Sequence, residues 1–267
     1  MSICFQKVTQ TFGSKIVLKE VSFEVPKGKI LFILGKSGVG KSVTLKLIVG
    51  MLKASSGQVL VDGQDVMQLQ DEGLAQVRRK CGMVFQYPAL LDSLTLYENL
   101  SFGLRPFCTP NPGTILMSEA EIRKTVLEKL SLVHLGPEIL ELFPHQISYG
   151  MQKRISLART LAPEPHYLLF DEPTTGLDPI TTQAVNDLIF DLSRKLKVTS
   201  IVVSHDMACA LQIADQILVL DEAQIIAQGT VDEIKQSSVP LVQEFLKETL
   251  ALFPLEENRS STHDPSP

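Results

Sequence analysis

The feature that most constrains this chain is a glycine-rich turn between an apolar run and a helical pattern. Residues 35–42 read GKSGVGKS and match the phosphate-loop pattern GxxxxGK[ST] at every position. The preceding run Ile30–Leu34 is continuously apolar, which predicts a strand buried on both faces of a parallel sheet. Apolar residues at helical spacing follow over residues 45–52. The pattern therefore predicts a strand, a phosphate-binding loop and a helix in that order.

The chemistry of this loop predicts that it binds nucleotide phosphates. Glycines let the backbone curl so that successive N–H groups point at the β-phosphate, and the helix N-terminus adds its positive end. Lys41 should reach the β- and γ-phosphate oxygens, and the Ser42 hydroxyl should hold Mg²⁺. We therefore expect ATP and Mg²⁺ as ligands. The residues expected to bind ATP here are Gly35, Lys36, Ser37, Gly38, Val39, Gly40, Lys41 and Ser42.

A second apolar run ends in two acids. Residues 167–170 read YLLF and are followed by Asp171 and Glu172. Ligands of parallel sheets bind at the carboxyl ends of the strands, where these carboxylates would lie. Asp171 is placed to support the Mg²⁺ shell, and Glu172 is placed to orient or deprotonate an attacking water.

The remaining patterns predict an α/β fold with a helical insert. Strands with turns are expected up to Gly63, and a mostly helical segment over residues 86–161. Within that segment, residues 106–113 are rich in Pro and Gly and predict a loop. The same segment contains a predicted capping box at residues 118–121. After it we expect a helix over 181–196, a strand TSIVVS, a hairpin ILVLDEAQIIAQG, a helix over 242–252 and a loose tail over 254–267.

Charge and composition argue against several classes of protein. The net charge of −5 argues against non-specific nucleic-acid binding, which needs a basic face. No apolar run is long enough to span a bilayer, and the first residues lack the apolar region of a signal peptide. The four cysteines have no CxxC spacing, which argues against a zinc site and fits a reducing cytosol. Any contact with a membrane is therefore expected to come through a partner.

Further motifs, taken in chain order, resemble those of the ABC ATPase family over nearly the whole chain. They are Phe12 in QTFGSK, Gln86 in GMVFQYP, residues 147–152 (ISYGMQ), residues 176–178 (GLD) and His205 in VVSHD. The resemblance implies a P-loop NTPase fold of the ABC type over residues 1–253, with a mostly parallel core, an antiparallel β subdomain and a helical subdomain at about 87–161.

The same resemblance implies roles for residues outside the phosphate loop. Phe12 would stack on adenine, and Gln86 would contact Mg²⁺ and the lytic water. His205 would contact the γ-phosphate, so that Glu172, His205 and Gln86 form the catalytic set. The implied Mg²⁺ ligands are Ser42, Gln86 and Asp171.

The signature motif departs from the family pattern LSGGQ. Tyr149 replaces its first glycine, and Met151 replaces the glutamine, as in a subgroup of the family. Ser148, Gly150 and Met151, together with Asp178 of the GLD motif, are expected to contact nucleotide held by a second copy of the chain. The effect of Tyr149 on closure of such a dimer is open.

The resemblance also implies partners. Two copies would associate head to tail, because one chain has a single phosphate loop and a single signature, and they would drive a membrane permease from its cytoplasmic face. Residues 87–106 (YPALLDSLTLYENLSFGLRP) resemble the corresponding segment of MCE-associated, Mla-type phospholipid transport ATPases. That group implies an MCE-type lipid-binding protein and a small regulatory subunit as further partners.

Three alternatives stay open at this level. An ATPase of an importer for polar solutes such as amino acids would carry the same motifs. A soluble ABC protein acting on ribosomes or DNA is opposed by the acidic charge, the single ATPase unit and the lack of sustained heptads. A regulator that binds ATP without hydrolysing it is supported only by Tyr149.

Overall fold

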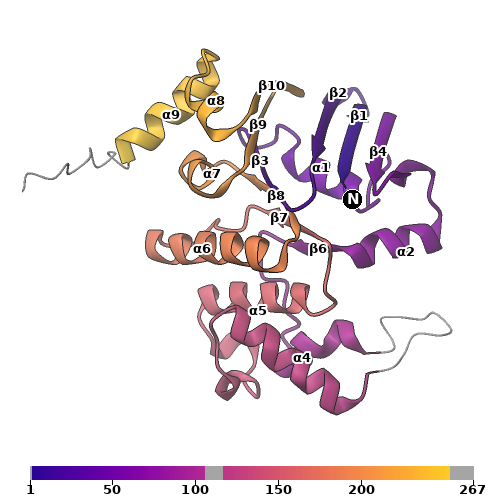
Figure 1. Ribbon diagram of the computed structural model, residues 1–267, viewed down its shortest axis with the longest axis vertical. Coiled ribbons are helices and arrows are strands. Elements are labelled where there is room, and N and C mark those ends of the chain that lie inside the picture. Colours follow the sequence, from indigo (N-terminus) through magenta and orange to yellow (C-terminus); the bar gives the residue numbers. More distant parts are fainter. Residues whose placement is uncertain (1, 106–116, 253–267) are drawn as a thin grey trace, which may run out of the picture.

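A six-stranded sheet lies at the centre of the molecule. The computed structural model describes residues 2–105 and 117–252 (Figure 1). The strand order is β10-β9-β3-β8-β7-β6, with β10 antiparallel to β9 and all other neighbours parallel, so the predicted parallel core and the predicted β9–β10 hairpin are confirmed. Its strands are β3 (Ile30–Leu34), β6 (Cys81–Val84), β7 (Tyr167–Asp171), β8 (Thr199–Ser204), β9 (Gln216–Asp221) and β10 (Gln224–Gly229).

Strand β3 separates two hydrophobic cores, as its continuous apolar run predicts. Ile30, Phe32 and Leu34 pack into the core formed with the helices on one face of the sheet. Leu31 and Ile33 point the other way, into a core shared with α1 (Lys41–Ile48) and the second sheet. Because successive side chains of a strand alternate between faces, both faces of β3 must be apolar. The phosphate loop is therefore anchored to a strand whose residues are all buried.

The second sheet is antiparallel and packs on the side of β3 occupied by α1. Its strand order is β2-β1-β4-β5, and the rings of Phe5 and Phe23 stack across β1 and β2 with centroids 4.5 Å apart. The Lys19 N–H donates to the Ala223 carbonyl at 2.7 Å and joins this sheet to the β9–β10 turn. The strands are β1 (Ile3–Phe12), β2 (Lys15–Val25), β4 (Ser56–Val61) and β5 (Gln64–Asp65).

Helix α1 is shorter than its apolar stripe predicts. The stripe runs to Leu52, but the helix ends at Ile48 because Gly50 adopts φ +62°. The N–H groups of Gly50 and Met51 donate back to the carbonyls of Leu47 and Lys46 at 3.1 and 2.9 Å. This is the hydrogen-bond pattern of a Schellman motif, which the sequence did not reveal.

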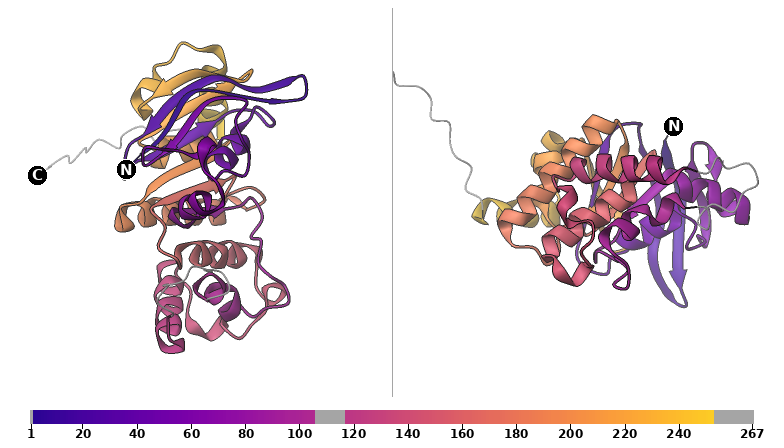
Figure 2. Two further views of the ribbon diagram at one scale, coloured as in Figure 1. Left: turned by 90° about the vertical axis from the view of Figure 1, so that its right-hand side faces the viewer. Right: turned by 90° about the horizontal axis from the view of Figure 1, so that it is seen from below.

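The predicted helical segment forms one end of the molecule, opposite the antiparallel sheet (Figures 1 and 2). The capping box is confirmed, since the Ser118 hydroxyl accepts from the Glu121 N–H and the Glu121 carboxylate accepts from the Ser118 N–H. The helices here are α3 (Leu96–Ser101), α4 (Glu119–Leu132) and α5 (Tyr149–Leu161). The expected loop at 106–113 and the tail at 254–267 lie outside the described residues.

The other helices are α2 (Asp71–Lys80), α6 (Pro179–Leu196), α7 (Met207–Ile213), α8 (Val231–Lys235) and α9 (Pro240–Leu252). Short 3₁₀ turns occur at Val66–Gln68, Phe102–Leu104, Pro137–Ile139 and Pro144–Gln146. Helix α2 was not expected, because its sequence has no apolar stripe, and it accordingly buries a single residue, Val77. Within residues 2–105 and 117–252, no helix has the length and apolarity needed to cross a bilayer.

Candidate active site

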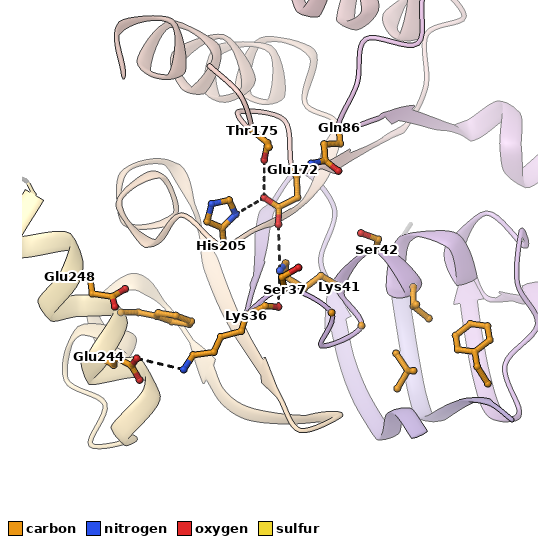
Figure 3. A pocket seen from close by; sticks show the side chains of 16 residues that line it. Lys36, Ser37, Lys41, Ser42, Gln86, Glu172, Thr175, His205, Glu244 and Glu248 are labelled. Atoms are coloured by element: carbon orange, nitrogen blue, oxygen red, sulfur yellow. Dashed lines mark hydrogen bonds and ion pairs between the residues drawn. The ribbon is translucent and has the colours of Figure 1, made fainter. Parts of the chain in front are cut away.

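A cleft of about 700 Å³ opens at the carboxyl ends of the parallel strands. Residues that are far apart in the sequence line it together, and they come from the phosphate loop, β1 and the segments that follow β6, β7 and β8 (Figure 3). The predicted site residues that line this cleft are Phe12, Lys36, Ser37, Gly38, Gly40, Lys41, Ser42, Gln86, Glu172 and His205. The predicted site residues outside its lining are Gly35, Val39, Ser148, Gly150, Met151, Asp171 and Asp178.

Two glycines of the phosphate loop have no room for a side chain. A Cβ on Gly35 would lie 2.4 Å from the Leu220 carbonyl oxygen of β9. Gly40, which precedes α1, has φ +110°, and a Cβ there would lie 2.8 Å from the Val17 carbonyl oxygen. The loop is thus packed against both sheets by its own backbone, which leaves its concave side free for a ligand.

Lys41 is the most deeply buried charge of the cleft. Its side chain is 7% exposed and donates to the carbonyls of Gly35 at 2.8 Å and Lys36 at 3.1 Å. Its Nζ also lies 3.4 Å from Oε1 of Glu172. A buried ammonium needs such partners, and here they hold it at the mouth of the phosphate loop.

Ser42 and Asp171 meet directly beside the loop. The Ser42 hydroxyl donates to Oδ1 of Asp171 at 2.7 Å. A hydroxyl and a carboxylate in contact are hard oxygen ligands of the kind Mg²⁺ prefers, with the remaining positions filled by water and phosphate. In the described part of the chain, no cluster of three or more His, Cys, Asp or Glu side chains forms a metal site of its own. The donor set therefore fits Mg²⁺ that is shared with a nucleotide.

Glu172 joins three functional groups. It directly follows β7 with φ +48°, and its N–H donates to the Val203 carbonyl of β8 at 2.9 Å. While Oε1 faces Lys41, Oε2 lies 2.8 Å from Nδ1 of His205 and accepts from the Thr175 hydroxyl at 3.3 Å (Figure 3). Such a carboxylate is held in place for proton transfer, because each oxygen has a partner. Sequence analysis did not predict Thr175, since an isolated threonine in PTTGLD carries no signal of its own.

Phe12 offers an exposed ring at the edge of the cleft. It ends β1, its side chain is 48% exposed, and Val17 and Val43 line the cleft with it. An exposed aromatic face beside apolar side chains is suited to stacking on a nucleotide base.

The signature and GLD residues lie together, but outside the cleft. Ser148 is the N-cap of α5 and accepts from the Met151 N–H at 3.3 Å, and Asp178 is the N-cap of α6 and accepts from the Thr181 N–H at 3.0 Å. A Cβ on Gly150 would lie 2.9 Å from Cγ2 of Thr181, so the two helix N-termini are close neighbours. Hydrogen bonds from Thr181 lower the pKa of Asp178, which is exposed.

Helix α9 also reaches the cleft. Its apolar face, with Val242 and Leu246, packs into the core, while Glu244, Phe245 and Glu248 line the cleft. Lys36 of the phosphate loop lies 3.5 Å from Oε1 of Glu244. The sequence predicted this helix but not its position, because nothing in its pattern says which part of the fold it covers.

Comparisons with known proteins give the family of this chain. Residues 18–175 match the family model described as ABC transporter. The chain is 39% identical to the intermembrane phospholipid transport ATP-binding protein MlaF of Haemophilus influenzae, covering 88% of this chain and 86% of MlaF. It is also 39% identical to the sulfate/thiosulfate import ATP-binding protein CysA of Neisseria meningitidis, covering 93% of this chain and 67% of CysA. The chain spans 66% of the probable ribonucleotide transport protein mkl of Mycobacterium tuberculosis, with 36% identity.

Solved structures of ATP-binding cassettes share this fold. The ATP-binding cassette MJ0796, in a dimeric post-hydrolysis state with ADP and Pi, superposes with a TM-score of 0.75 at 32% identity, covering 86% of this chain and 98% of that one. The protein cbiO1 of Clostridium perfringens, part of the transporter complex cbiONQ, gives a TM-score of 0.79 at 28% identity and covers 94% and 95% of the two chains.

Proposed function

Because this chain belongs to the ABC transporter family of ATP-binding proteins, we propose that it is the ATP-hydrolysing subunit that drives a membrane permease. One observation supports this most directly. Lys41, Glu172 and His205, from three different segments, are joined side chain to side chain at the phosphate loop. A protein that only bound ATP would not need a carboxylate held between a phosphate-binding lysine and a histidine.

Phosphate binding follows from the geometry of Lys41. Its ammonium would exchange the contact with Glu172 for the β- and γ-phosphate oxygens, while its hydrogen bonds to Gly35 and Lys36 keep it in place. Phe12 would hold the adenine at the other end of the cleft. This exchange would free Oε1 of Glu172 at the moment when substrate arrives.

Hydrolysis would then use the freed carboxylate. Glu172 would accept a proton from the attacking water, with Oε2 kept in position by His205 and Thr175. His205 would donate a hydrogen bond to the γ-phosphate, and the Gln86 amide would orient the water. Ser42, Asp171 and Gln86 would hold Mg²⁺, which when bound offsets the negative charge of the phosphates.

Two copies of the chain would complete the site. Ser148, Gly150, Met151 and Asp178 lie outside their own cleft. The N-caps Ser148 and Asp178 are exposed and Gly150 and Met151 are half-buried, so these two helix N-termini could receive the phosphate of an opposing subunit. ATP-dependent closure of this dimer, followed by opening after hydrolysis, would move the permease. Residues 1–253 would form this ATPase unit, with the helical subdomain at about 87–161.

The replacement Glu172→Gln tests the catalytic assignment. We expect ATP binding to persist and turnover to fall by about 10²–10⁴, which is the usual contribution of a positioned base. Glu222→Gln is a matched control, because Glu222 also follows a strand of the same sheet with positive φ, yet lies outside the cleft. Unchanged turnover in the Glu172 variant would remove that residue from the role of base.

For the cargo, we favour phospholipid. Residues 87–106, the variant Met151 and the run Asp178-Pro179-Ile180-Thr181 resemble the Mla-type group, and MlaF is among the similar proteins. The alternative is a polar solute, because CysA is equally identical. The cytoplasmic face of the membrane, reached through the permease, would be the location in either case.

Extraction of the tagged protein from its native membranes in mild detergent separates these cargoes. Co-purification of a permease, an MCE-type protein and phospholipid, identified by mass spectrometry, is the expected result. A permease that arrives with a receptor for a polar solute would overturn the lipid assignment and keep the ATPase.

A further inference from the structure

Two side chains of α5 converge on one backbone atom of the loop after β6. The Tyr149 hydroxyl donates to the Gln86 carbonyl oxygen at 3.4 Å, and the Lys153 ammonium donates to the same oxygen. Tyr149 and Lys153 are one helical turn apart, so they share a face of α5. The Lys153 Nζ also lies 5.6 Å from the centroid of the Tyr149 ring, within the range of a cation–π contact. The three groups therefore form one cluster, the Gln86 clamp.

Lys153 is buried in apolar surroundings, which makes its hydrogen bond to Gln86 important for the placement of its charge. The residue is 4% exposed, and burial lowers the pKa of its ammonium to about 8. Val84 of β6, Phe170 of β7 and Val185 of α6 line a small apolar cavity with it. An ammonium in such surroundings is costly unless it is hydrogen-bonded. The Gln86 carbonyl accepts that hydrogen bond. A methionine or leucine at position 153 would fill the same space without the free-energy cost of burying a charge.

The clamp connects two functional segments of the same subunit. The Gln86 side chain lines the nucleotide cleft, close to Glu172 in Figure 3. Tyr149 is the residue directly after Ser148, the N-cap of the signature helix. A Cβ on Gly176 would lie 3.9 Å from Cε1 of Tyr149, so the ring also faces the GLD segment. Tyr149 thus lies between the Gln86 loop and the segment that leads to Asp178.

We propose that Tyr149 and Lys153 are positioning residues that hold Gln86 in the cleft through its backbone carbonyl, and so link the signature helix to hydrolysis in its own subunit. This inference rests on the proposed role of Gln86. A glycine at this position of the signature has no side chain that could reach the Gln86 carbonyl. Tyr149 therefore adds a contact within its own subunit that the family pattern lacks.

Turnover of the purified full chain with MgATP tests the clamp. Lys153→Met should lower kcat about tenfold or more, because it removes a charge-assisted hydrogen bond, while KM for ATP changes less than about twofold. Tyr149→Phe removes only a long, neutral hydrogen bond and should lower kcat about two- to fivefold. Lys153→Arg keeps a charged donor and should recover part of the loss. Mg²⁺ titrations should show a higher half-saturating concentration in the methionine variant.

Matched controls exclude general damage. Lys129→Met also removes a buried ammonium from the helical end of the molecule, where Lys129 pairs with Glu164 at 2.9 Å. Tyr87→Phe removes a hydroxyl one residue after Gln86 from a side chain that is 69% exposed. Both controls should retain the kcat of the wild type. A loss in them equal to the loss in the clamp variants would overturn the inference.

A double-mutant cycle with Gln86→Ala separates this inference from the proposed function. If Gln86→Ala leaves kcat unchanged, the assigned role of Gln86 fails, and the clamp fails with it. If Gln86→Ala lowers kcat, the clamp predicts that adding Lys153→Met lowers it little further, because there is no amide left to position. Full additivity of the two losses would overturn the clamp and leave the proposed function intact.

Discussion

The nucleotide cleft and the N-terminus of α5 carry functional groups in different ways. In the cleft, Lys41, Glu172 and His205 follow β3, β7 and β8, and their side chains bond to one another. At α5, Ser148 is exposed and, among the described residues, bonds only within its own helix end. The Tyr149 side chain points back toward its own subunit. The cleft is therefore organised by a single chain, whereas under the proposed function the signature surface would be completed by a second copy of the chain. Changes in the first region should act on chemistry, changes at Ser148 on association, and changes at Tyr149 on both.

The largest effect is expected from Lys41→Ala. This change removes the charged donor from the phosphate loop and leaves Glu172 without its cation, so both ATP binding and hydrolysis should fall, turnover by at least about 10²–10³. Radioactive ATP binding and phosphate release would measure the two losses. Lys46→Ala, on the exposed side of α1, is the control and should behave as the wild type. Wild-type hydrolysis by the Lys41 variant would show that the loop is not the phosphate site.

An intermediate effect is expected from Tyr149→Gly. Removing a bulky side chain beside Ser148 should let two subunits close more tightly, and loss of the clamp should slow the hydrolysis that reopens them. We expect the affinity of ATP-dependent dimerisation to rise about tenfold, a free-energy change of about 1.4 kcal/mol. Sedimentation with ATP would measure it. Tyr149→Phe keeps the bulk of the side chain and should raise the affinity of dimerisation far less than Tyr149→Gly does. Identical dimerisation of the glycine variant and the wild type would show that Tyr149 does not affect closure.

The smallest effect concerns the pH dependence of stability at Lys153. Its pKa in the folded chain is lowered to about 8, below the usual value for lysine, so the folded state gives up this proton before the unfolded state does. Burial of the charge therefore destabilises the fold fully below pH 8, and this cost disappears as pH rises toward the pKa of the unfolded chain. Lys153→Met should be more stable than the wild type at pH 7.

Denaturant unfolding of both proteins between pH 7 and 10.5 would measure this. The difference in unfolding free energy between the variant and the wild type should shrink as the pH rises. A constant difference would show that Lys153 does not titrate in this range.

Much of the fold could be predicted because its signals are local. The continuous apolar run of β3 and the capping box of α4 depend on neighbouring residues, and both give the expected structure. The early end of α1 at Gly50 and the weakly apolar helix α2 were not predictable, since their outcome depends on what packs against them.

Part of the candidate site could be predicted because phosphate and Mg²⁺ favour particular residue types. The sequence predicts Ser42 and Asp171 for one Mg²⁺ site, and the two side chains are in contact in the structure. Thr175, Glu244 and the clamp on Gln86 were not predictable, because each depends on how distant segments meet. A tyrosine in a signature motif can be noticed in the sequence, but its partner can only be found in three dimensions.

The position of β3 has a consequence for how the protein is made. Its hydrogen-bonded neighbours are β8 and β9, with Ile30 opposite Ser200 and Leu31 opposite Gln216. During synthesis β3 and the phosphate loop leave the ribosome long before β8 and β9, the two strands that hold them in the sheet. Contacts so distant in sequence form slowly, and the buried strand stays exposed until they form. The nascent chain therefore completes its ATP site only after β8 and β9 have been made, and the apolar run of β3 needs protection from aggregation until then.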